Sequence, residues 1–318
     1  MKVLITGING FVGSHLAELF LQEQAEVHGT IRPRSEVANI SKILDRIYLH
    51  EVDIRDPHSC YEVMKKVKPD LIFHLAALSF VPVSWTNTNE VMMVNVMGTL
   101  NILQAVKEFV PTSRILVAGS SEEYGKVLET EVPISESNAL RPLSPYGVSK
   151  VAADKLALQF FHAYGLHVVV TRAFNHTGPR RPDKFVVSSF CKQVVDKESM
   201  EGQQLIEVGN LDAIRDFTDV RDMVVAYKLA LDLCEPGECY NISSGGGWSI
   251  HEVLSTIFLM SHKKNNFQMV IDKNRLRPSD VPRLIGDSTK FRKCTGWHPL
   301  IPFSKTIIDI LDYWRKRK

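Results

Sequence analysis

The sequence predicts an α/β fold in which a doubly wound parallel sheet is combined with a smaller C-terminal α/β domain. Three observations support this prediction. Short apolar runs alternate with stretches of helical periodicity as far as residue 172. A turn with three glycines follows the first apolar run. Small and polar residues follow several other runs, at the strand ends where sheets of this kind bind ligands.

The elements are expected in a regular order. The sheet strands are predicted at 2–6, 26–31, 47–52, 71–77, 114–118 and 168–171. Later helices are predicted at 185–197, 223–234, 249–260 and 303–315, with strands at 206–208, 240–242 and 267–271. We expect residues 1–172, with about 212–242, to form a dinucleotide-binding Rossmann domain, and residues 173–211 and 243–318 to form a substrate domain.

The first turn has the spacing Gly-x-x-Gly-x-x-Gly between a strand and a helix. Glycines allow a tight turn and a close approach of the backbone, and the helix N-terminus offers free N–H groups to a pyrophosphate. The alternative is a plain strand–helix turn with glycine caps. The residues expected to hold the cofactor here are Gly7, Gly10, Phe11, Val12 and Gly13.

The second strand ends in Arg32-Pro33-Arg34 and lacks a carboxylate. A carboxylate at this point would hydrogen-bond the adenosine ribose and exclude a 2′-phosphate. The two arginines therefore favour NADPH, with Arg32 and Arg34 near the phosphate. The alternative is that both arginines face water and that NADH is also accepted.

The next two strand ends supply further contacts to a dinucleotide. Asp53 and Ile54 follow the third strand, where Asp53 would hold the adenine amino group or cap the helix that starts near Pro57. The fourth strand ends in Leu75, Ala76 and Ala77, whose small side chains let the backbone approach the cofactor.

Two polar segments come after the fifth strand. The first, Gly119 to Gly125, contains hydroxyls and carboxylates. The second places Tyr146 four residues before Lys150, so that both side chains share one helix face. A cation beside a phenol lowers its pKa. Such a tyrosine can exchange a proton with a carbonyl or alkoxide oxygen, although this spacing also occurs by chance in surface helices.

Composition excludes several classes of protein. The 318 residues have a formal net charge of +2, so no strong field attracts nucleic acid. The five cysteines are odd in number and lack Cys-x-x-Cys spacing, which favours reduced thiols over disulfides or a zinc site. The chain runs directly into the glycine turn, and no apolar run approaches the ~20 residues of a membrane span. We expect a cytoplasmic protein without nucleic-acid or membrane partners.

With the glycine turn, the serine-rich strand end and the Tyr–Lys pair in series, the chain resembles the extended short-chain dehydrogenases/reductases. Longer segments at 174–179, 185–187, 208–212, 215–222 and 276–282 resemble the GDP-mannose branch of that family. The resemblance implies NADPH-dependent reduction of the C4 ketone of GDP-6-deoxy-4-keto-D-mannose to GDP-D-rhamnose, by a homodimer. A GDP-mannose 4,6-dehydratase, a bifunctional enzyme and a non-catalytic cofactor sensor are the alternatives.

The resemblance also implies roles for the polar residues. Tyr146 would protonate the C4 oxygen, and Lys150 would hold the nicotinamide ribose and keep the pKa of Tyr146 low. Ser120 would hydrogen-bond the same oxygen, and Ser121 is the alternative residue for that role. Asn95 would be linked to Lys150 through water or, alternatively, would be a satisfied polar residue inside a helix.

The remaining implied contacts are to the nucleotide-sugar. Arginine suits a diphosphate because its planar fork binds phosphate oxygens bidentately. The alternative for Arg215 is an ion pair with Asp216 or Asp219, and for Arg277 a place on a surface loop. The residues implied to bind the substrate are Ser79, Phe80, Ser121, Asn175, Lys192, Arg215, Arg277 and Asp280.

Glu122 leaves the reaction open between reductase and dehydratase. It stands two residues before Tyr124, where the resemblance places the dehydratase base that removes the C5 proton. Against the dehydratase, the chain is short for that enzyme, and the residues around Asn175 and Phe217 look more like those of the reductase.

Overall fold

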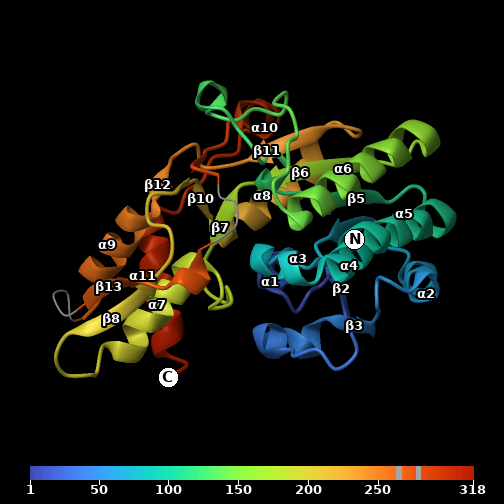
Figure 1. Ribbon diagram of the computed structural model, residues 1–318. Coiled ribbons are helices and arrows are strands. Elements are labelled where there is room, and N and C mark those ends of the chain that lie inside the picture. Colours follow the sequence, from blue (N-terminus) through green and yellow to red (C-terminus); the bar gives the residue numbers. More distant parts are fainter. Residues whose placement is uncertain (263–266, 277–280) are drawn as a thin grey trace.

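The computed structural model describes residues 1–262, 267–276 and 281–318. Within them lies a seven-stranded parallel sheet with the order β11-β6-β5-β4-β1-β2-β3 (Figure 1). The strand order reverses between β1 and β4, which confirms the doubly wound fold and places a ligand-binding switch point there. The strands are β1 (Lys2–Thr6), β2 (Glu26–Ile31), β3 (Tyr48–Glu51), β4 (Leu71–His74), β5 (Arg114–Ala118), β6 (Val168–Ala173) and β11 (Cys239–Ile242).

Helices cover both faces of this sheet because successive strand residues point to opposite faces and both faces are apolar. In β4, Phe73 packs with Phe20 in a core on one face, whereas Ile72 packs with Phe160 in a second core on the other face. The first core is covered by α1 (Phe11–Gln22) and α8 (Val220–Leu233), and the second by α2 (Pro57–Val67), α5 (Gly98–Phe109) and α6 (Pro145–Tyr164).

The C-terminal half adds a smaller unit, drawn in yellow to red on the left of Figure 1. Three of its helices surround a third core that includes Val194, Leu254 and Ile310. These helices are α7 (Val186–Lys197), α9 (Ile250–Met260) and α11 (Phe303–Arg315), beside the parallel pair β8 (Gln204–Val208) and β13 (Phe267–Ile271).

The remaining elements are short. The pair β7 (Asn175–Thr177) and β10 (Phe217–Asp219) and the group β9 (Ile214–Arg215), β12 (Trp248–Ser249) and β14 (Arg283–Leu284) form two small sheets. The short helices are α3 (Val81–Thr86), α4 (Thr88–Met92) and α10 (Thr289–Thr295), and a π-helical segment (Met93–Met97) joins α4 to α5. None of the helices in the described part of the chain is both long and apolar enough to span a bilayer.

Several element boundaries differ from the sequence-based expectation by one to three residues, and two of them have a clear local cause. The helix expected from Met223 begins three residues earlier, because the Asp219 carboxylate accepts a hydrogen bond from the Arg221 N–H and caps it. The fourth strand ends at His74, because the N–H groups of Leu75 and Ala76 donate to the Thr6 hydroxyl. This turns the chain out of the sheet beside the glycine turn.

We predict that Phe73→Ala lowers the free energy of unfolding by about 3–5 kcal/mol, because it removes a fully buried ring from the centre of the sheet. Chemical denaturation measures the change. Leu300→Ala is the matched control, since Leu300 is 82% exposed and should change stability by less than about 0.5 kcal/mol. Equal effects of the two substitutions would contradict the placement of Phe73 in the core.

Candidate active site

A cavity of about 980 Å³ lies at the switch point of the sheet. One wall consists of the glycine turn, the segments after β4 and β5, and the first turn of α6. The opposite wall consists of β7, the loop before α7, and the first residues of α7. Parallel strands present their carboxyl ends at the same edge of a sheet, so residues from distant parts of the chain meet here.

The glycine turn forms part of the first wall of this cavity. Gly7 has a φ of +70°, a backbone conformation that residues with a side chain rarely adopt. A Cβ atom on Gly13 would lie 2.5 Å from the Gly7 carbonyl oxygen, so the helix can follow the strand this closely only with glycine there. Gly10 precedes α1 and has no side chain to cap it. The first N–H groups of α1 therefore remain available to an anion, as expected from the motif.

The segment after β4 is fixed against the glycine turn. The Thr6 hydroxyl accepts hydrogen bonds from the N–H groups of Leu75 (3.1 Å) and Ala76 (3.0 Å). A Cβ atom on Gly7 would lie 3.2 Å from the Ala76 Cα. Leu75, Ala76 and Ala77 all line the cavity, so a dinucleotide can approach the backbone closely at this point.

Most of the residues expected around the adenosine end of the cofactor line the cavity. Arg32, Asp53 and Ile54 do so, whereas Arg34 is not among the residues that line it. The Asp53 carboxylate accepts hydrogen bonds from the guanidinium of Arg55, whose proximity lowers the pKa of Asp53. Asp53 does not cap the following helix, because Asp56 accepts the hydrogen bonds at the N-terminus of α2.

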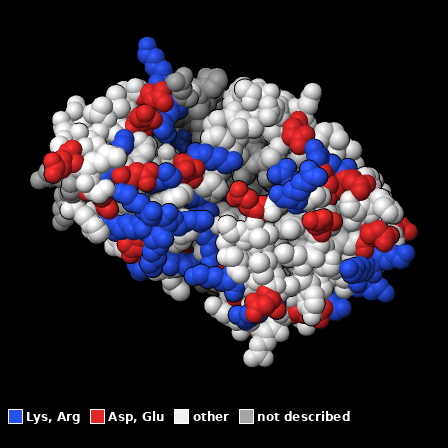
Figure 2. All heavy atoms as spheres, turned by 90° about the horizontal axis from the view of Figure 1, so that it is seen from below, with Lys and Arg blue, Asp and Glu red and all other residues white. Residues whose placement is uncertain are grey.

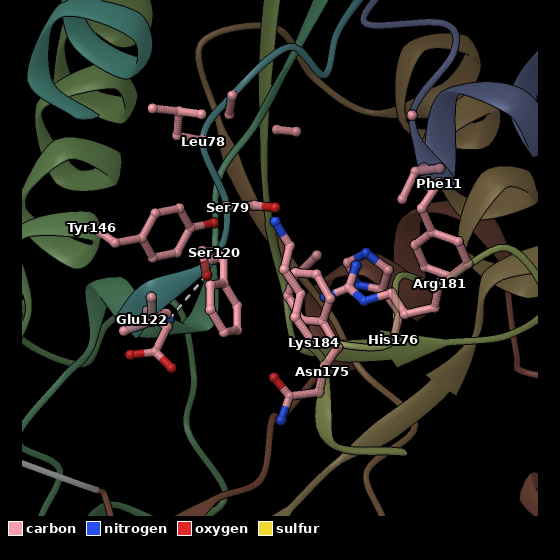
Figure 3. Close-up of a pocket in the computed structure, with 18 of the residues that line it drawn as sticks. Phe11, Leu78, Ser79, Ser120, Glu122, Tyr146, Asn175, His176, Arg181 and Lys184 are labelled. Carbon is pink, nitrogen blue, oxygen red and sulfur yellow. Dashed lines mark hydrogen bonds between the residues drawn. The ribbon is translucent and has the colours of Figure 1, made fainter. Parts of the chain in front are cut away.

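The serine-rich strand end forms a tight turn above the sheet. Ser120 caps a short 3₁₀ helix (Ser121–Glu123), since its hydroxyl accepts a hydrogen bond from the Glu122 N–H (3.2 Å). Figure 3 shows Ser120 and Glu122 side by side and the Tyr146 ring pointing toward Ser120. Ser121 is buried and is not among the described residues that line the cavity. Ser120 is therefore better placed than Ser121 for a role in the cavity.

Tyr146 and Lys150 come from the first two turns of α6. The helix begins where the Ser144 hydroxyl accepts a hydrogen bond from the Gly147 N–H (3.0 Å). The Lys150 ammonium donates to the Ala118 carbonyl at the end of β5 (2.7 Å) and lies 6.0 Å from the centre of the Tyr146 ring. This bond ties α6 to the strand end that carries Ser120.

The electrostatics differ from the expectation that Lys150 keeps the pKa of Tyr146 low. Burial raises the pKa of Tyr146, and the groups that lower it are Ser120, through a hydrogen bond, and Arg181, through its charge. Burial also lowers the pKa of Lys150 to about 8. In this structure Tyr146 is accordingly a protonated phenol at neutral pH and therefore carries a proton that it can donate.

Four residues expected to contact substrate line the cavity. Ser79 and Phe80 come from the segment after β4, and Asn175 from β7 (Figure 3). Arg215 also lines the cavity, and its guanidinium donates to the carbonyls of Ile214 (2.9 Å) and Val281 (2.7 Å).

Two of the expected residues that the structure describes, Lys192 and Asn95, are not brought into the cavity. The Lys192 ammonium instead pairs with Asp196 (2.7 Å). Asn95 is buried and holds the main-chain N–H and carbonyl of Leu78, at 2.8 and 3.1 Å, and it also donates to the Ser149 hydroxyl. Asn95 therefore positions a segment of the cavity wall. Arg277 and Asp280 lie outside the described residues.

The family profile described as GDP-mannose 4,6 dehydratase matches residues 4–310. The chain belongs to this family. The GDP-6-deoxy-D-mannose reductase of Pseudomonas aeruginosa is 33% identical over 99% of this chain and 98% of that protein. The GDP-mannose 4,6 dehydratase of Homo sapiens is 33% identical over 97% of this chain and 90% of that protein.

A solved structure also matches this chain over its full length. The structure of RMD from Pseudomonas aeruginosa complexed with NADPH has a TM-score of 0.86 and 31% identity, and the match covers 100% of this chain and 99% of that chain. The comparisons confirm the predicted fold, the predicted family and the prediction that the chain is an enzyme.

This member of the GDP-mannose 4,6 dehydratase family has cavity residues that the motifs did not reveal. The Arg181 guanidinium lies 3.6 Å from the centre of the Phe185 ring and 4.9 Å from that of Phe11. The His176 ring is parallel to the Phe11 ring, and burial lowers the pKa of His176 to about 4. A cation beside the glycine turn can hold a phosphate, and the paired arginines before Pro182 were the signal available in the sequence.

Lys184 is a second cation of this wall. Its ammonium lies 5.1 Å from the centre of the Phe80 ring, and it points toward Ser79 across the cavity in Figure 3. The neighbouring Arg180 instead pairs with Glu18 of α1 (2.5 Å). The loop before α7 is thus anchored to the first helix of the sheet layer while its other cations face the cavity.

We predict that Gly13→Ala weakens dinucleotide binding by at least about tenfold and lowers stability by about 1–3 kcal/mol, because the new methyl group meets main-chain atoms of Gly7 and Ile8. Calorimetric titration with NADPH and thermal unfolding measure the two effects. Gly246→Ala is the control, since the atom nearest to its new Cβ is a side-chain oxygen at 3.7 Å. Unchanged binding in Gly13→Ala would rule out the close fit described for this turn.

Proposed function

We propose that this protein is an NADPH-dependent reductase of the C4 ketone of GDP-6-deoxy-4-keto-D-mannose and forms GDP-D-rhamnose. The observation that carries the proposal is the pair of hydroxyls of Ser120 and Tyr146 at the cavity wall, with Tyr146 held in its protonated form. Reduction of a ketone requires a proton donor at the oxygen. The identity of 33% over 99% of the chain to a GDP-6-deoxy-D-mannose reductase supports the same reaction.

The cavity fits the cofactor that this reaction requires. The close approach of Gly13 to the Gly7 carbonyl leaves room for a pyrophosphate at the N-terminus of α1. Arg181 beside Phe11 would neutralise part of its charge, and Arg32 would bind the 2′-phosphate. When bound, NADPH supplies the hydride that C4 receives.

The chain's own residues would handle the proton and the negative charge. The hydroxyls of Ser120 and Tyr146 donate hydrogen bonds to the ketone oxygen, and Tyr146 gives up its proton as charge develops on that oxygen. The Lys150 ammonium, held by the Ala118 carbonyl, stabilises the phenolate that remains. Tyr146 is then reprotonated before the next turnover.

The opposite wall suits a substrate with two phosphates. Arg215 and Asn175 line the cavity away from the glycine turn and would contact the diphosphate and the sugar. On the face seen from below, Lys and Arg side chains gather over the C-terminal elements (Figure 2). Such a concentration of positive charge attracts an anionic nucleotide-sugar toward the cavity. A homodimer and a cytoplasmic location remain predictions.

A GDP-mannose 4,6-dehydratase is the second candidate, and Glu122 is the observation that favours it. Glu122 lines the cavity, and its charge raises the pKa of Tyr146. A carboxylate at this position could remove the C5 proton of an oxidised sugar. That reaction returns the hydride to the sugar and consumes no reduced cofactor, so the two candidates differ in stoichiometry.

The decisive assay supplies GDP-6-deoxy-4-keto-D-mannose, prepared with a separate dehydratase, together with NADPH. We expect one NADPH to be oxidised per sugar reduced, followed as loss of absorbance of the reduced cofactor. GDP-mannose alone should give no keto sugar by NMR. Conversion of GDP-mannose without added reductant, combined with no oxidation of NADPH by the keto sugar, would replace the reductase with the dehydratase.

We predict that Tyr146→Phe lowers kcat by about 10²–10⁴-fold, because the variant lacks the proton donor. NADPH binding, measured by calorimetry, should be retained. The control is Tyr164→Phe, since Tyr164 lies on the same helix but is 51% exposed. Wild-type turnover by Tyr146→Phe would exclude Tyr146 as the acid.

A further inference from the structure

A buried ion cluster lies directly beneath the turn that carries Ser120. It consists of Glu123, Asp154 and Arg172, which are 0%, 1% and 3% exposed. The Arg172 guanidinium donates to the Asp154 carboxylate at 2.7 and 2.9 Å and to the Glu123 carboxylate at 3.2 Å. Two carboxylates from different elements, the 3₁₀ turn and α6, therefore share one cation from β6.

The second carboxylate of this cluster needs an explanation beyond ion pairing. Asp154 alone already provides a two-bond partner for Arg172, and adding another buried negative charge costs desolvation energy and like-charge repulsion. Both effects are visible at Glu123, because burial and the charge of Asp154 raise its pKa. The other oxygen of Asp154 accepts no hydrogen bond from a described group, and the Lys155 ammonium lies 3.7 Å from it.

Glu123 also contacts the catalytic turn itself. Its carboxylate accepts a hydrogen bond from the Ser120 N–H at 2.7 Å and so closes the turn that Ser120 caps. A Cβ atom on Gly119 would lie 2.5 Å from the same carboxylate oxygen, so the carboxylate is packed closely against the chain just before Ser120. The direction of the Ser120 hydroxyl therefore depends on Glu123.

The charge of Glu123 acts on Lys150 as well. The Lys150 ammonium donates to the Ala118 carbonyl and the Glu123 carboxylate accepts from the Ser120 N–H, so both side chains hold the same short segment at the end of β5. Burial lowers the pKa of Lys150, and the charge of Glu123 opposes that effect. The titratable groups that interact with Glu123, with Lys150 or with the Arg172–Asp154 pair are His74, Tyr124, Tyr146, Asp154, Lys155, Arg172 and Cys239. Among them, Arg172 is already paired by the two carboxylates.

We propose that Glu123 is a positioning residue that orients the Ser120 turn and places a buried negative charge against the Lys150 ammonium. This inference rests on the proposed reduction, in which Ser120 and Lys150 take part. As the pH rises, the carboxyl of Glu123 ionises and the negative charge of the cluster grows. Lys150 therefore keeps its proton to a higher pH than burial alone would allow.

The test compares Glu123→Gln with Glu123→Leu. Glutamine can still accept the hydrogen bond from Ser120 but carries no charge, so its kcat at the pH optimum stays near that of the wild type. The alkaline limb of its kcat/KM profile moves to lower pH by about one unit. Leucine also lacks the acceptor, so Glu123→Leu loses a further ~10-fold in kcat at every pH.

The pH dependence of NADPH affinity, measured by calorimetry, gives a readout that needs no turnover. Its alkaline midpoint should move down by the same amount in Glu123→Gln. Glu136→Gln is the matched control, since Glu136 likewise accepts a hydrogen bond from a main-chain N–H, that of Asn241 at 2.8 Å. Both of its profiles should superimpose on those of the wild type.

The outcomes separate this inference from the proposed function. Wild-type protein that fails to reduce the keto sugar would contradict the function, while the NADPH-affinity profiles would still test Glu123. An active wild type whose profiles are reproduced by Glu123→Gln would overturn the inference. Thermal unfolding of both variants shows whether a loss of activity reflects loss of folded protein.

Discussion

The hydrogen bond from the Lys150 ammonium to the Ala118 carbonyl joins the two elements on which the candidate active site depends. It ties α6 to the carboxyl end of β5, so Tyr146 on that helix lies against the Ser120 turn that follows that strand. The cofactor half of the cavity depends on an equally local constraint, the contact of Gly13 with the Gly7 carbonyl. Both arrangements exist because the strands are parallel and end at one edge of the sheet.

Much of this site could be predicted from the sequence because its signals are local. The glycine spacing, the Tyr–Lys spacing and the serine-rich strand end each depend on residues close together in the chain. Lys192 shows where such reasoning fails. Helix α7 presents Val187 and Ser189 to the cavity but pairs Lys192 with Asp196 farther along the helix, and only the packing of α7 determines which of its residues face inward.

Other features required tertiary structure for a different reason. Arg181 reaches the cavity only because a loop from the C-terminal half contacts Phe11 near the start of the chain. The raised pKa of Tyr146 reflects burial, which no spacing in the sequence reports. The same holds for Glu123, whose neighbour Glu122 faces the cavity while its own carboxylate faces the interior. Adjacent glutamates therefore have different environments because the 3₁₀ turn points them in opposite directions.

The central claim is that hydride from NADPH is transferred to C4 of a keto sugar while Tyr146 supplies the proton. The most direct measurement is incubation of GDP-6-deoxy-4-keto-D-mannose with NADPH that carries deuterium at the transferable position of its nicotinamide. The account predicts a GDP-6-deoxyhexose with deuterium at C4, detected by NMR. A reduced product without deuterium at C4, or deuterium at another carbon, would contradict it.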